Sequence, residues 1–218
     1  MSDGNTEWFV SYQVSPVELD LLLAHGWRHF GINFFRYKTS VIHQDIFHVI
    51  PLRINLAHFQ ISKSQKKILS KNQDTKIVIR PAEIDDEKES LFYQHIDRFQ
   101  DNQPTSIYDF LSDSPHDTPC ETYELCVYLK GKLIACSFFD QGRNSISSIY
   151  AMFDLTESKR SLGIYTMLLE IEYAIRTGKS YFYSGYAYTE PSVYDYKKRF
   201  DSLEYLQWSM GWFPFKRD

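Results

Sequence analysis

The sequence has 218 residues, of which 43% are hydrophobic and 24% are charged, the balance of a globular protein with a sizeable core. No apolar run reaches the roughly 20 residues that span a bilayer, and "MSDGNTEWFV" resembles no secretory signal, so we expect no membrane association. Cys120, Cys126 and Cys136 form no C-x-x-C pair, which favours reduced cysteines and a cytoplasmic location.

The first hundred residues alternate predicted helices and strands. "SPVELDLLLAHGW" predicts a helix, because Ser15, Pro16 and Glu18 fit its capped start and Gly26 fits its end. The remaining predictions are strands at 29–37, 49–59 and 75–82, a lysine-rich helix at 63–72 and an acidic amphipathic helix at 84–99.

The stretch "SKSQKKILSKN" (62–72) concentrates positive charge in a chain whose net charge is -4. Ser62 is its predicted N-cap, with Gln65 completing a capping box. Lys63, Lys67 and Lys71 recur at helical spacing and share one face, which places Ile68 on the packed side.

Charge is also divided between neighbouring segments. Residues 53–80 hold seven Lys or Arg and one acid, whereas residues 81–124 hold twelve acids and two basic residues. This division predicts a positive face on an acidic body, suited to a polyanion; a solvated helix that serves only solubility is the alternative.

The second half begins after a turn-rich segment (101–119) with a short helix at 107–111, where we place the boundary between domains 1–100 and 101–218. "TYELCVYLKGKLIACSFFD" predicts a β-hairpin around Gly131, followed by a strand at 145–154. A long helix ending before Gly178, a strand at 180–188, a short helix at 192–200 and the final strand "LEYLQWSMGWFPF" complete the prediction.

This order resembles the GNAT acyltransferase fold, so the predicted fold class is α+β: a GNAT-like lobe with a smaller N-terminal α/β lobe. In GNAT proteins, a glycine-containing loop at a helix start holds the pyrophosphate of coenzyme A. "RSLGIY" (160–165) occupies that place here, and the bulk of Tyr165 argues against coenzyme A.

Several motifs occur together in order. They are "LLAHGWRHFGINFFRY", "PLRINLAHFQISKSQKKILSKNQD", "IYDFLSDSP" and "ESKRSLGIYTMLLEIEYAIRTGKSYFYSGYAYTEPSVYDYKKRFDSLEYL". With them, the sequence resembles the aminoacyl-tRNA–protein transferases of the arginyl and bacterial leucyl type. The resemblance covers about residues 21–206 and implies transfer of an amino acid, arginine or leucine, from charged tRNA to the N-terminus of an acceptor.

This reaction is an acyl transfer in which an α-amine attacks an activated ester, so no enzyme nucleophile is required. The predicted catalytic residues are Asp154 to orient the amine, Arg53 to meet an acidic acceptor side chain, and Tyr150. A cap and a structural ion pair are the alternative roles for Asp154 and Arg53.

Binding of tRNA requires contacts to phosphates, which favours cations, small polar donors and a helix N-terminus. The predicted tRNA-binding residues are Lys63, Ser64, Gln65, Lys66, Lys67, Lys71, Asn72, Arg160, Ser161, Gly163 and Lys197. The other predicted substrate-binding residues, besides Arg53, are Glu124, Tyr186, Tyr194 and Tyr196, of which the tyrosines offer stacking faces.

The resemblance also implies a departure, because this chain lacks the cysteines that family members use for metal or iron–sulfur binding. We therefore expect no resident cofactor, with aminoacyl-tRNA as co-substrate. A replacement metal site at His43, Asp45 and His48 is less favoured than ordinary loop residues. The expected partners are aminoacyl-tRNA and an acceptor N-terminus, without DNA.

Three alternatives remain open from the sequence. The chain could modify one dedicated peptide, act as an acyl-CoA-dependent N-acetyltransferase, or bind RNA or N-termini without catalysis. The sequence does not distinguish arginine from leucine as the donor.

Overall fold

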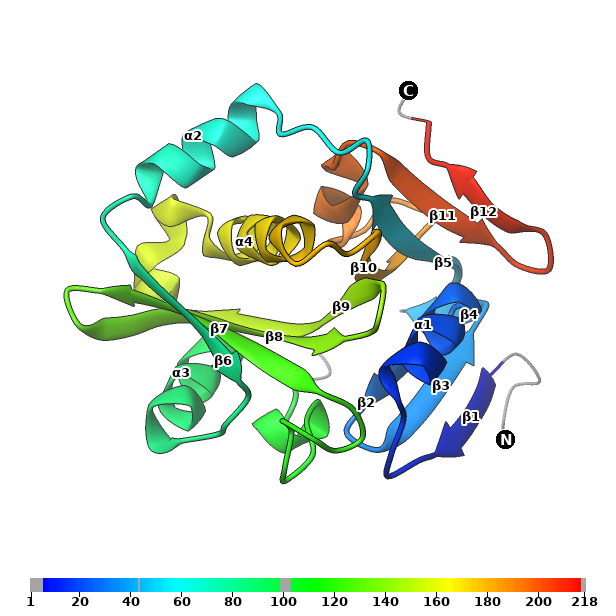
Figure 1. Ribbon diagram of the computed structural model, residues 1–218, viewed down its shortest axis with the longest axis horizontal. Coiled ribbons are helices and arrows are strands. Elements are labelled where there is room, and N and C mark those ends of the chain that lie inside the picture. The colour runs from blue at the N-terminus through cyan, green and yellow to red at the C-terminus, as the bar shows by residue number, and fades with distance from the viewer. Residues whose placement is uncertain (1–5, 43, 99–102, 217–218) are drawn as a thin grey trace.

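A mixed nine-stranded sheet forms the centre of the computed structural model, which describes residues 6–42, 44–98 and 103–216 (Figure 1). In sheet order the strands are β12 (Gly211–Pro214), β11 (Leu203–Gln207), β5 (Asp45–Asn55), β10 (Tyr181–Tyr188), β9 (Ser145–Phe153), β8 (Lys132–Gln141), β7 (Thr122–Leu129) and β6 (Lys76–Pro81), with β4 (Thr39–Ile42) paired to β5. The chain thus has the predicted α+β class.

Strands β9 and β10 are parallel, and their pairing is short. It joins Ser145–Ser147 to Tyr181–Tyr183 and then ends, so the two strands separate. Just beyond, each strand carries one extra residue relative to its other neighbour: Ile149 in β9 and Ser184 in β10. Such bulges bend a strand and commonly lie next to functional sites.

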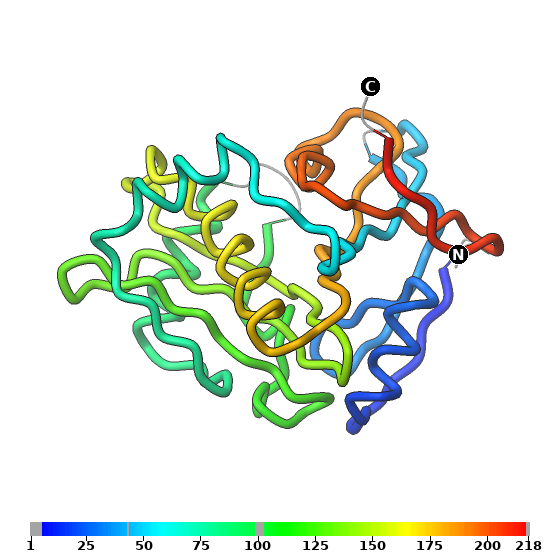
Figure 2. Tube along the Cα trace, turned by 45° about the horizontal axis from the view of Figure 1, so that its top comes forward, coloured from blue at the N-terminus to red at the C-terminus, as the bar shows by residue number. Residues whose placement is uncertain are grey.

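Two helices cover opposite faces of the sheet formed by β6 to β9 (Figure 1). Helix α4 (Leu162–Arg176) packs on one face through Leu168 and Ile171, and α3 (Asp86–Ile96) packs on the other through Leu91 and Phe92. The apolar period predicted for α4 is therefore confirmed at these positions. Helix α2 (Lys63–Lys71) lies outside α4, at the edge of the molecule (Figure 2).

The N-terminal part forms a separate three-stranded sheet beside the large one. Its order is β1 (Thr6–Val10), β3 (Asn33–Tyr37) and β2 (Arg28–Phe30), and α1 (Pro16–Ala24) packs against it through Leu19 and Leu23. The single strand predicted at 29–37 is wrong, because Gly31, at a φ of 49°, turns the chain into the β2–β3 hairpin.

Two further predictions at the C-terminal end need correction. The final segment is a hairpin of β11 and β12 instead of one strand, with Ser209 at a φ of 67° and Gly211 at 109° in its turn. The helix predicted at 192–200 is a short 3₁₀ turn, η3 (Asp195–Arg199). Similarly, the helix at 107–111 is the 3₁₀ turn η1 (Ile107–Asp109).

Local capping signals are confirmed. The Ser15 hydroxyl accepts from the Glu18 N–H at 3.3 Å while the Glu18 carboxylate accepts from the Ser15 N–H at 2.9 Å. Gly26 adopts a φ of 82° after α1, where a residue with a side chain is disfavoured. The β7–β8 hairpin around Gly131 also forms as predicted.

Both halves of the chain contribute to the large sheet. Strand β5 lies between β10 and β11, and β6 forms the edge next to β7. The division into domains 1–100 and 101–218 stays a prediction, although a shared sheet joins the two ranges. None of the helices in the described part of the chain is long and apolar enough to cross a membrane.

Candidate functional site

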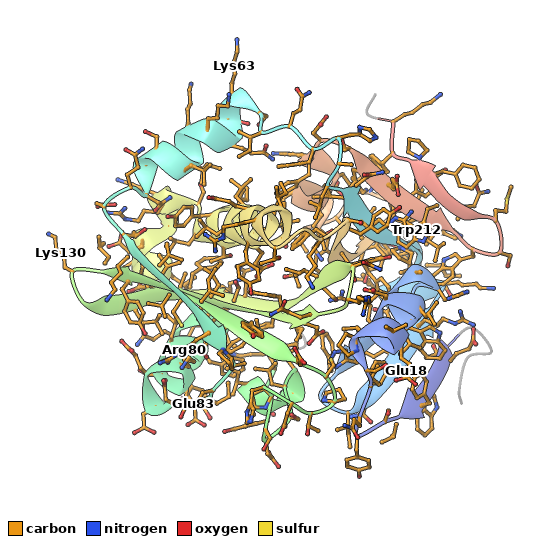
Figure 3. The ribbon with its side chains drawn as sticks, in the orientation of Figure 1. Glu18, Lys63, Arg80, Glu83, Lys130 and Trp212 are labelled. Atoms are coloured by element: carbon orange, nitrogen blue, oxygen red, sulfur yellow. The ribbon has the colours of Figure 1, made fainter. Side chains whose placement is uncertain are left out.

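Helix α2 carries most of the predicted tRNA-binding residues. Its cap forms as predicted, since the Gln65 N–H donates to the Ser62 hydroxyl at 3.2 Å and the Gln65 side chain accepts from the Ser62 N–H at 2.9 Å. Gln65 is buried in this cap, so it does not face a ligand. Of the predicted tRNA-binding residues in this helix, Lys63, Ser64, Lys66, Lys67 and Lys71 are exposed, and Figure 3 shows Lys63 pointing into solvent at the outer end.

The C-terminal end of α2 lies against the loop that precedes α4. Lys71 Nζ donates to the backbone carbonyl of Lys159, and Asn72 Nδ2 donates to that of Arg160 at 3.0 Å. Asn72 is completely buried, which makes it a structural connector rather than an exposed donor. The Lys71 end of the lysine face therefore lies beside the loop before α4, an arrangement that a shared RNA ligand would need.

The loop before α4 is held by ion pairs. Arg160 binds Asp74 through both terminal nitrogens, at 2.8 and 2.9 Å, and binds Glu157 through Nε at 2.9 Å. Hydrogen bonds from the guanidinium to Asp74 and Glu157 raise the pKa of Arg160. The predicted contact between Arg160 and a tRNA phosphate is untested. A phosphate would have to compete with these two carboxylates for the guanidinium.

The start of α4 has open backbone geometry. Ser161 adopts a left-handed φ of 57° and makes no side-chain cap. A Cβ on Gly163 would lie 3.2 Å from the Phe153 ring, so close packing accounts for this glycine. Tyr165 is buried, and its hydroxyl lies 3.1 Å from the Thr75 hydroxyl and donates to the Asn72 carbonyl at 3.4 Å.

A second charged region fills the opening between β9 and β10. Arg28, at the start of β2, is 9% exposed and reaches β9, where Nη1 donates to the Ser147 hydroxyl at 2.5 Å and Nη2 donates to the Ser148 carbonyl. Ser147 is the last β9 residue paired to β10, so Arg28 enters where the strands separate.

Glu170, on the buried face of α4, lies near Arg28 in this opening. It is 0% exposed, and neither carboxylate oxygen has a hydrogen-bond partner among the described residues. Burial raises the pKa of Glu170 to about 7, although the nearby hydroxyls of Ser137 and Ser148 and the charge of Arg28 oppose the shift. A buried carboxylate that meets no geometric hydrogen bond is costly for folding, which makes Glu170 a candidate site residue.

Lys197, on η3, approaches the same side of β10 as Arg28. Its Nζ donates to the Tyr186 carbonyl at 3.1 Å. A Cβ on Gly185 would lie 3.3 Å from this Nζ and 3.6 Å from Arg28 Nη2, so the two cations meet over a glycine. Burial, with a smaller contribution from Arg28, lowers the pKa of Lys197 to about 7.

Tyrosines surround these three charges. Tyr186 donates its hydroxyl to the Gly26 carbonyl at 2.6 Å, and its ring contacts Tyr37 edge-on at 5.2 Å between centroids. Tyr194 and Tyr196 are 41% and 36% exposed and form the outer side of the site. Burial raises the pKa of Tyr196 to about 12, so the phenol stays neutral near pH 7.

Tyr150 lies on the α3 side of the sheet. Its ring stacks on Phe110 at 4.0 Å, and its hydroxyl is buried without a hydrogen-bond partner among the described residues. Its catalytic role stays a prediction, and the packing explains most of its position.

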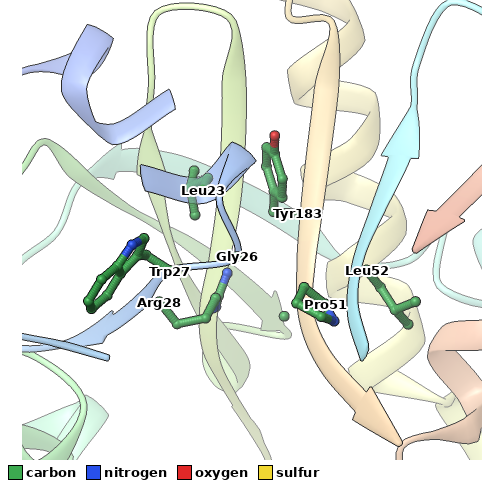
Figure 4. Close-up of a pocket in the computed structure, with 8 residues that line it drawn as sticks. Leu23, Gly26, Trp27, Arg28, Pro51, Leu52 and Tyr183 are labelled. Carbon is green, nitrogen blue, oxygen red and sulfur yellow. The ribbon is translucent and has the colours of Figure 1, made fainter. Parts of the chain in front are cut away.

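A small cavity lies between the N-terminal sheet and the large one. Its volume is about 10 Å³, and Figure 4 shows Trp27 and Arg28 on one side and Pro51, Leu52 and Tyr183 on the other. This volume holds at most one water molecule, so the cavity is no substrate site.

The other predicted site residues are engaged in structural contacts. Asp154 caps the 3₁₀ turn η2 (Leu155–Arg160), accepting from the Thr156 N–H at 2.9 Å, and binds Lys132 at 2.6 Å. Burial would raise the pKa of Asp154, but the bonds from Lys132 and Thr156 lower it. The cap foreseen as its alternative role is thus present, while its catalytic role is untested.

Glu124 and Arg53 likewise have protein partners. Glu124 is 0% exposed and binds Arg80 at 2.6 Å and Lys88 at 3.3 Å. Figure 3 shows Arg80 near α3, on the side of the sheet opposite α2. Arg53 binds Glu204 at 2.7 Å, and its guanidinium lies 3.9 and 4.3 Å from the Tyr181 and Trp212 ring centroids.

The three cysteines do not form a set of cluster ligands. Cys126 and Cys136 face each other across β7 and β8, with their Sγ atoms 3.7 Å apart, whereas Cys120 packs with the N-terminal core. An iron–sulfur cluster held by thiolates does not fit this arrangement. Of the residues considered for a replacement metal site, His43 lies outside the described residues. His48 Nδ1 lies 2.6 Å from Glu190 Oε1.

Sequence reasoning missed Arg28 and Glu170 as site residues. Arg28 stands in the quoted "GWRHFG" stretch, and Glu170 follows Met167 by three residues on the apolar face of the predicted helix. An acid on the buried face of an amphipathic helix is unusual and was the available signal.

Comparisons with known proteins identify a family. The family model described as "Arginine-tRNA-protein transferase, C terminus" matches residues 87–207. An aspartate/glutamate leucyltransferase of Campylobacter jejuni is 28% identical over 191 residues, which cover 85% of this chain and 78% of that protein. One of Acinetobacter baumannii is 27% identical over 207 residues, covering 90% and 73%.

Among solved structures, FemX is similar at a TM-score of 0.51 and 10% identity, covering 80% of this chain and 61% of that one. This likeness concerns the fold alone. The family match, in contrast, spans more than half of the sequence.

This chain therefore belongs to the arginine-tRNA–protein transferase family. It is an aminoacyltransferase, which moves an amino acid from tRNA to the N-terminus of a protein. The matched range contains Glu170 and Lys197, whereas Arg28 and α2 lie before it.

Proposed function

We propose that this chain transfers leucine from leucyl-tRNA to the α-amine of a protein that begins with aspartate or glutamate. The names of the relatives support leucine as donor and acidic residues as acceptors. We further propose that the reaction takes place at the opening between β9 and β10, in the cytoplasm, where charged tRNA is present.

The observation that carries this proposal is the charge arrangement in the opening. An N-terminal aspartate presents a positive α-ammonium and a negative side chain only a few ångströms apart. Glu170 offers an unpaired carboxylate, and Arg28 and Lys197 offer two cations on the same side of β10. The site thus has the complementary charges that such an acceptor needs.

Glu170 is the proposed proton acceptor. A base with a pKa near 7 can take the proton of the α-ammonium at neutral pH. The free amine then attacks the ester carbon: a C–N bond forms and the C–O bond to the tRNA ribose breaks. The proton that the nitrogen loses on becoming an amide passes to the ribose 3′ oxygen, which leaves as a hydroxyl.

Lys197 is the proposed contact for the acceptor carboxylate. Its lowered pKa reflects burial beside another cation, so binding of a carboxylate would restore its positive charge. An uncharged first residue would leave Arg28 and Lys197 without a counter-ion, which favours acidic acceptors.

Helix α2 supplies the proposed contact to tRNA. Lys63 and Lys66 lie near the N-terminus of this helix. There the interaction of a positive charge with the helix macrodipole is unfavourable, and it costs roughly 0.3–1 kcal/mol for each lysine. These lysines therefore do not stabilise the helix, and an external polyanion explains them better.

We also propose that the fold is GNAT-like. The separation of two parallel strands after three residue pairs, the bulge at Ile149 and the helix that connects the strands support this assignment. The similarity to FemX is consistent with it.

The test is transfer of labelled amino acid from individually charged tRNAs to peptides that differ only in the first residue. We expect leucine on peptides that begin with Asp or Glu and little on those that begin with Ala, Asn or Gln. The matched pairs Asp/Asn and Glu/Gln separate charge from size.

Absence of incorporation with every charged tRNA would refute the proposed function. Equal transfer to Asp and Asn peptides would contradict the proposed role of Arg28 and Lys197 in selecting acidic acceptors. Incorporation of arginine instead of leucine would show that arginyl-tRNA is the donor.

A further inference from the structure

Three buried side chains with metal-binding atoms converge beside β2. They are His29 of β2, Asp140 of β8 and Cys120 of the loop before β7, which are 4%, 0% and 3% exposed. His29 Nε2 lies 2.8 Å from Asp140 Oδ2 and 3.6 Å from Cys120 Sγ. All three ligand atoms lie within 4.8 Å of one another.

Outer hydrogen bonds already orient two of these side chains. His29 Nδ1 lies 2.8 Å from the Gly31 carbonyl, which only accepts, so Nδ1 carries a proton and donates. The second oxygen of Asp140 accepts from the Thr122 hydroxyl at 2.7 Å. A ring N–H bound to a carbonyl is the usual support of a metal-binding histidine, because it leaves Nε2 free to bind.

The distances fit a tetrahedral ion with small adjustments. Bonds of about 2.0 Å to nitrogen and 2.3 Å to sulfur place the two ligand atoms about 3.5 Å apart, close to the spacing of His29 Nε2 and Cys120 Sγ. Nitrogen and oxygen ligands lie about 3.3 Å apart, so Asp140 would move by roughly half an ångström.

We propose that His29 Nε2, Cys120 Sγ and Asp140 Oδ2 bind one zinc ion, with a water molecule as the fourth ligand. A neutral imidazole, a thiolate and a carboxylate balance the two charges of the ion, so the buried site is neutral. This site departs from the expectation that the protein has no metal, and it does not rest on the proposed donor or acceptor.

The ion would connect the two sheets next to the charged opening. Asp140 pairs with Ser147 across β8 and β9, and Ser147 accepts the hydrogen bond from Arg28, the neighbour of His29 in β2. A bond from His29 to Asp140 through zinc therefore holds β2 in register with β9 and fixes Arg28.

The competing arrangement is a metal-free ion pair. In this arrangement Nδ1 of His29 donates to the Gly31 carbonyl, and Nε2 is hydrogen-bonded to the Asp140 carboxylate. The Cys120 thiol then lies beside this pair, 3.6 Å from Nε2, whereas zinc binds all three side chains.

The test is zinc content of the full chain after incubation with zinc and removal of unbound ion, together with cobalt substitution. We expect one equivalent of zinc. Cobalt should produce a thiolate-to-metal charge-transfer absorption in the near ultraviolet, which reports a Co–S bond directly.

Cys120→Ser should abolish this absorption and reduce zinc content to background. Cys126→Ser is the matched control, because Cys126 is also a buried cysteine but lies in β7, outside the proposed site. Circular dichroism checks that both variants fold. If Cys120→Ser does not fold, Asp140→Asn is a second variant that removes a proposed zinc ligand.

The wild-type measurements decide the proposal without any variant. Absence of stoichiometric zinc and of the cobalt–thiolate absorption would overturn it in favour of the ion pair. A cobalt–thiolate absorption that persists in Cys120→Ser but disappears in Cys126→Ser would also overturn it, since the metal would then bind the other cysteines.

Discussion

Helix α2 and the opening between β9 and β10 both concentrate positive charge, but in different surroundings. The lysines of α2 project into water, where salt screens charges beyond about 8–10 Å. Arg28 and Lys197 lie against buried groups, where desolvation changes their pKa values. The first region is suited to attract a large polyanion, and the second is suited to distinguish the charge of a small group.

The strongest effect should come from Glu170→Gln, which removes the proposed base and keeps the size of the side chain. We expect the transfer rate constant to fall by about 10²–10⁴, the usual contribution of a general base. Single-turnover transfer with saturating leucyl-tRNA measures it. A rate within twofold of wild type would show that Glu170 does not accept the proton.

The same substitution should change the pH dependence of stability, independently of catalysis. The pKa of Glu170 is raised in the folded state to about 7 from 4.5, so the folded protein binds more protons between these values. The free energy of unfolding of wild type should therefore fall relative to Glu170→Gln as pH rises through this window, by at most about 3 kcal/mol. Urea unfolding at pH 4.5, 6 and 8 measures the difference, and a constant difference would contradict the buried titration.

Replacing the exposed lysines of α2 should have an intermediate effect and act on binding instead of chemistry. We expect Gln at Lys63, Lys66, Lys67 and Lys71 to raise the KM for charged tRNA by about tenfold or more, with little change in kcat. The slope of log affinity against log salt should decrease by about 0.7–0.9 for each phosphate that the helix no longer neutralises.

The matched single variants are Lys67→Gln and Arg143→Gln. Arg143 is exposed in the turn between β8 and β9, where its backbone contacts α1, distant from α2. Equal weakening by both variants would indicate a general charge effect and remove the special role of α2.

The smallest effect should come from Ser62→Ala, which removes the cap of α2. We expect a loss of about 1 kcal/mol in the free energy of unfolding, measured by urea. Affinity for tRNA should change little, because Asn72 fixes the other end of the helix. Ser70→Ala, an exposed position of the same helix, should leave stability within about 0.5 kcal/mol.

The two regions also differ in how well the sequence predicts them. The boundaries, cap and exposed face of α2 depend on residues three or four positions apart, and "SKSQKKILSKN" contains all of them. The same holds for Ser15 with Glu18 and for the β7–β8 hairpin.

The opening depends instead on contacts between distant segments. Arg28 lies near both Lys197 and Glu170 only because segments far apart in the sequence, β2, α4 and η3, come together at β9 and β10. Local patterns contain none of this information and favour Asp154 instead, an acid at the end of a predicted strand shortly before the glycine loop. The order of strands was missed for the same reason, since nothing in residues 45–55 indicates β10 and β11 as neighbours.

The position of β5 also has a consequence for synthesis of the chain. Its first residues pair with β4, but its apolar second half is covered by β10 and β11, strands that the ribosome makes after residue 180. Until then, Leu52 and Ile54 lack these strand partners, and the nascent protein exposes two open edges in this half of β5. We therefore expect cotranslational folding to proceed from the β6–β9 segment, so that an early strand of the large sheet joins it among the last.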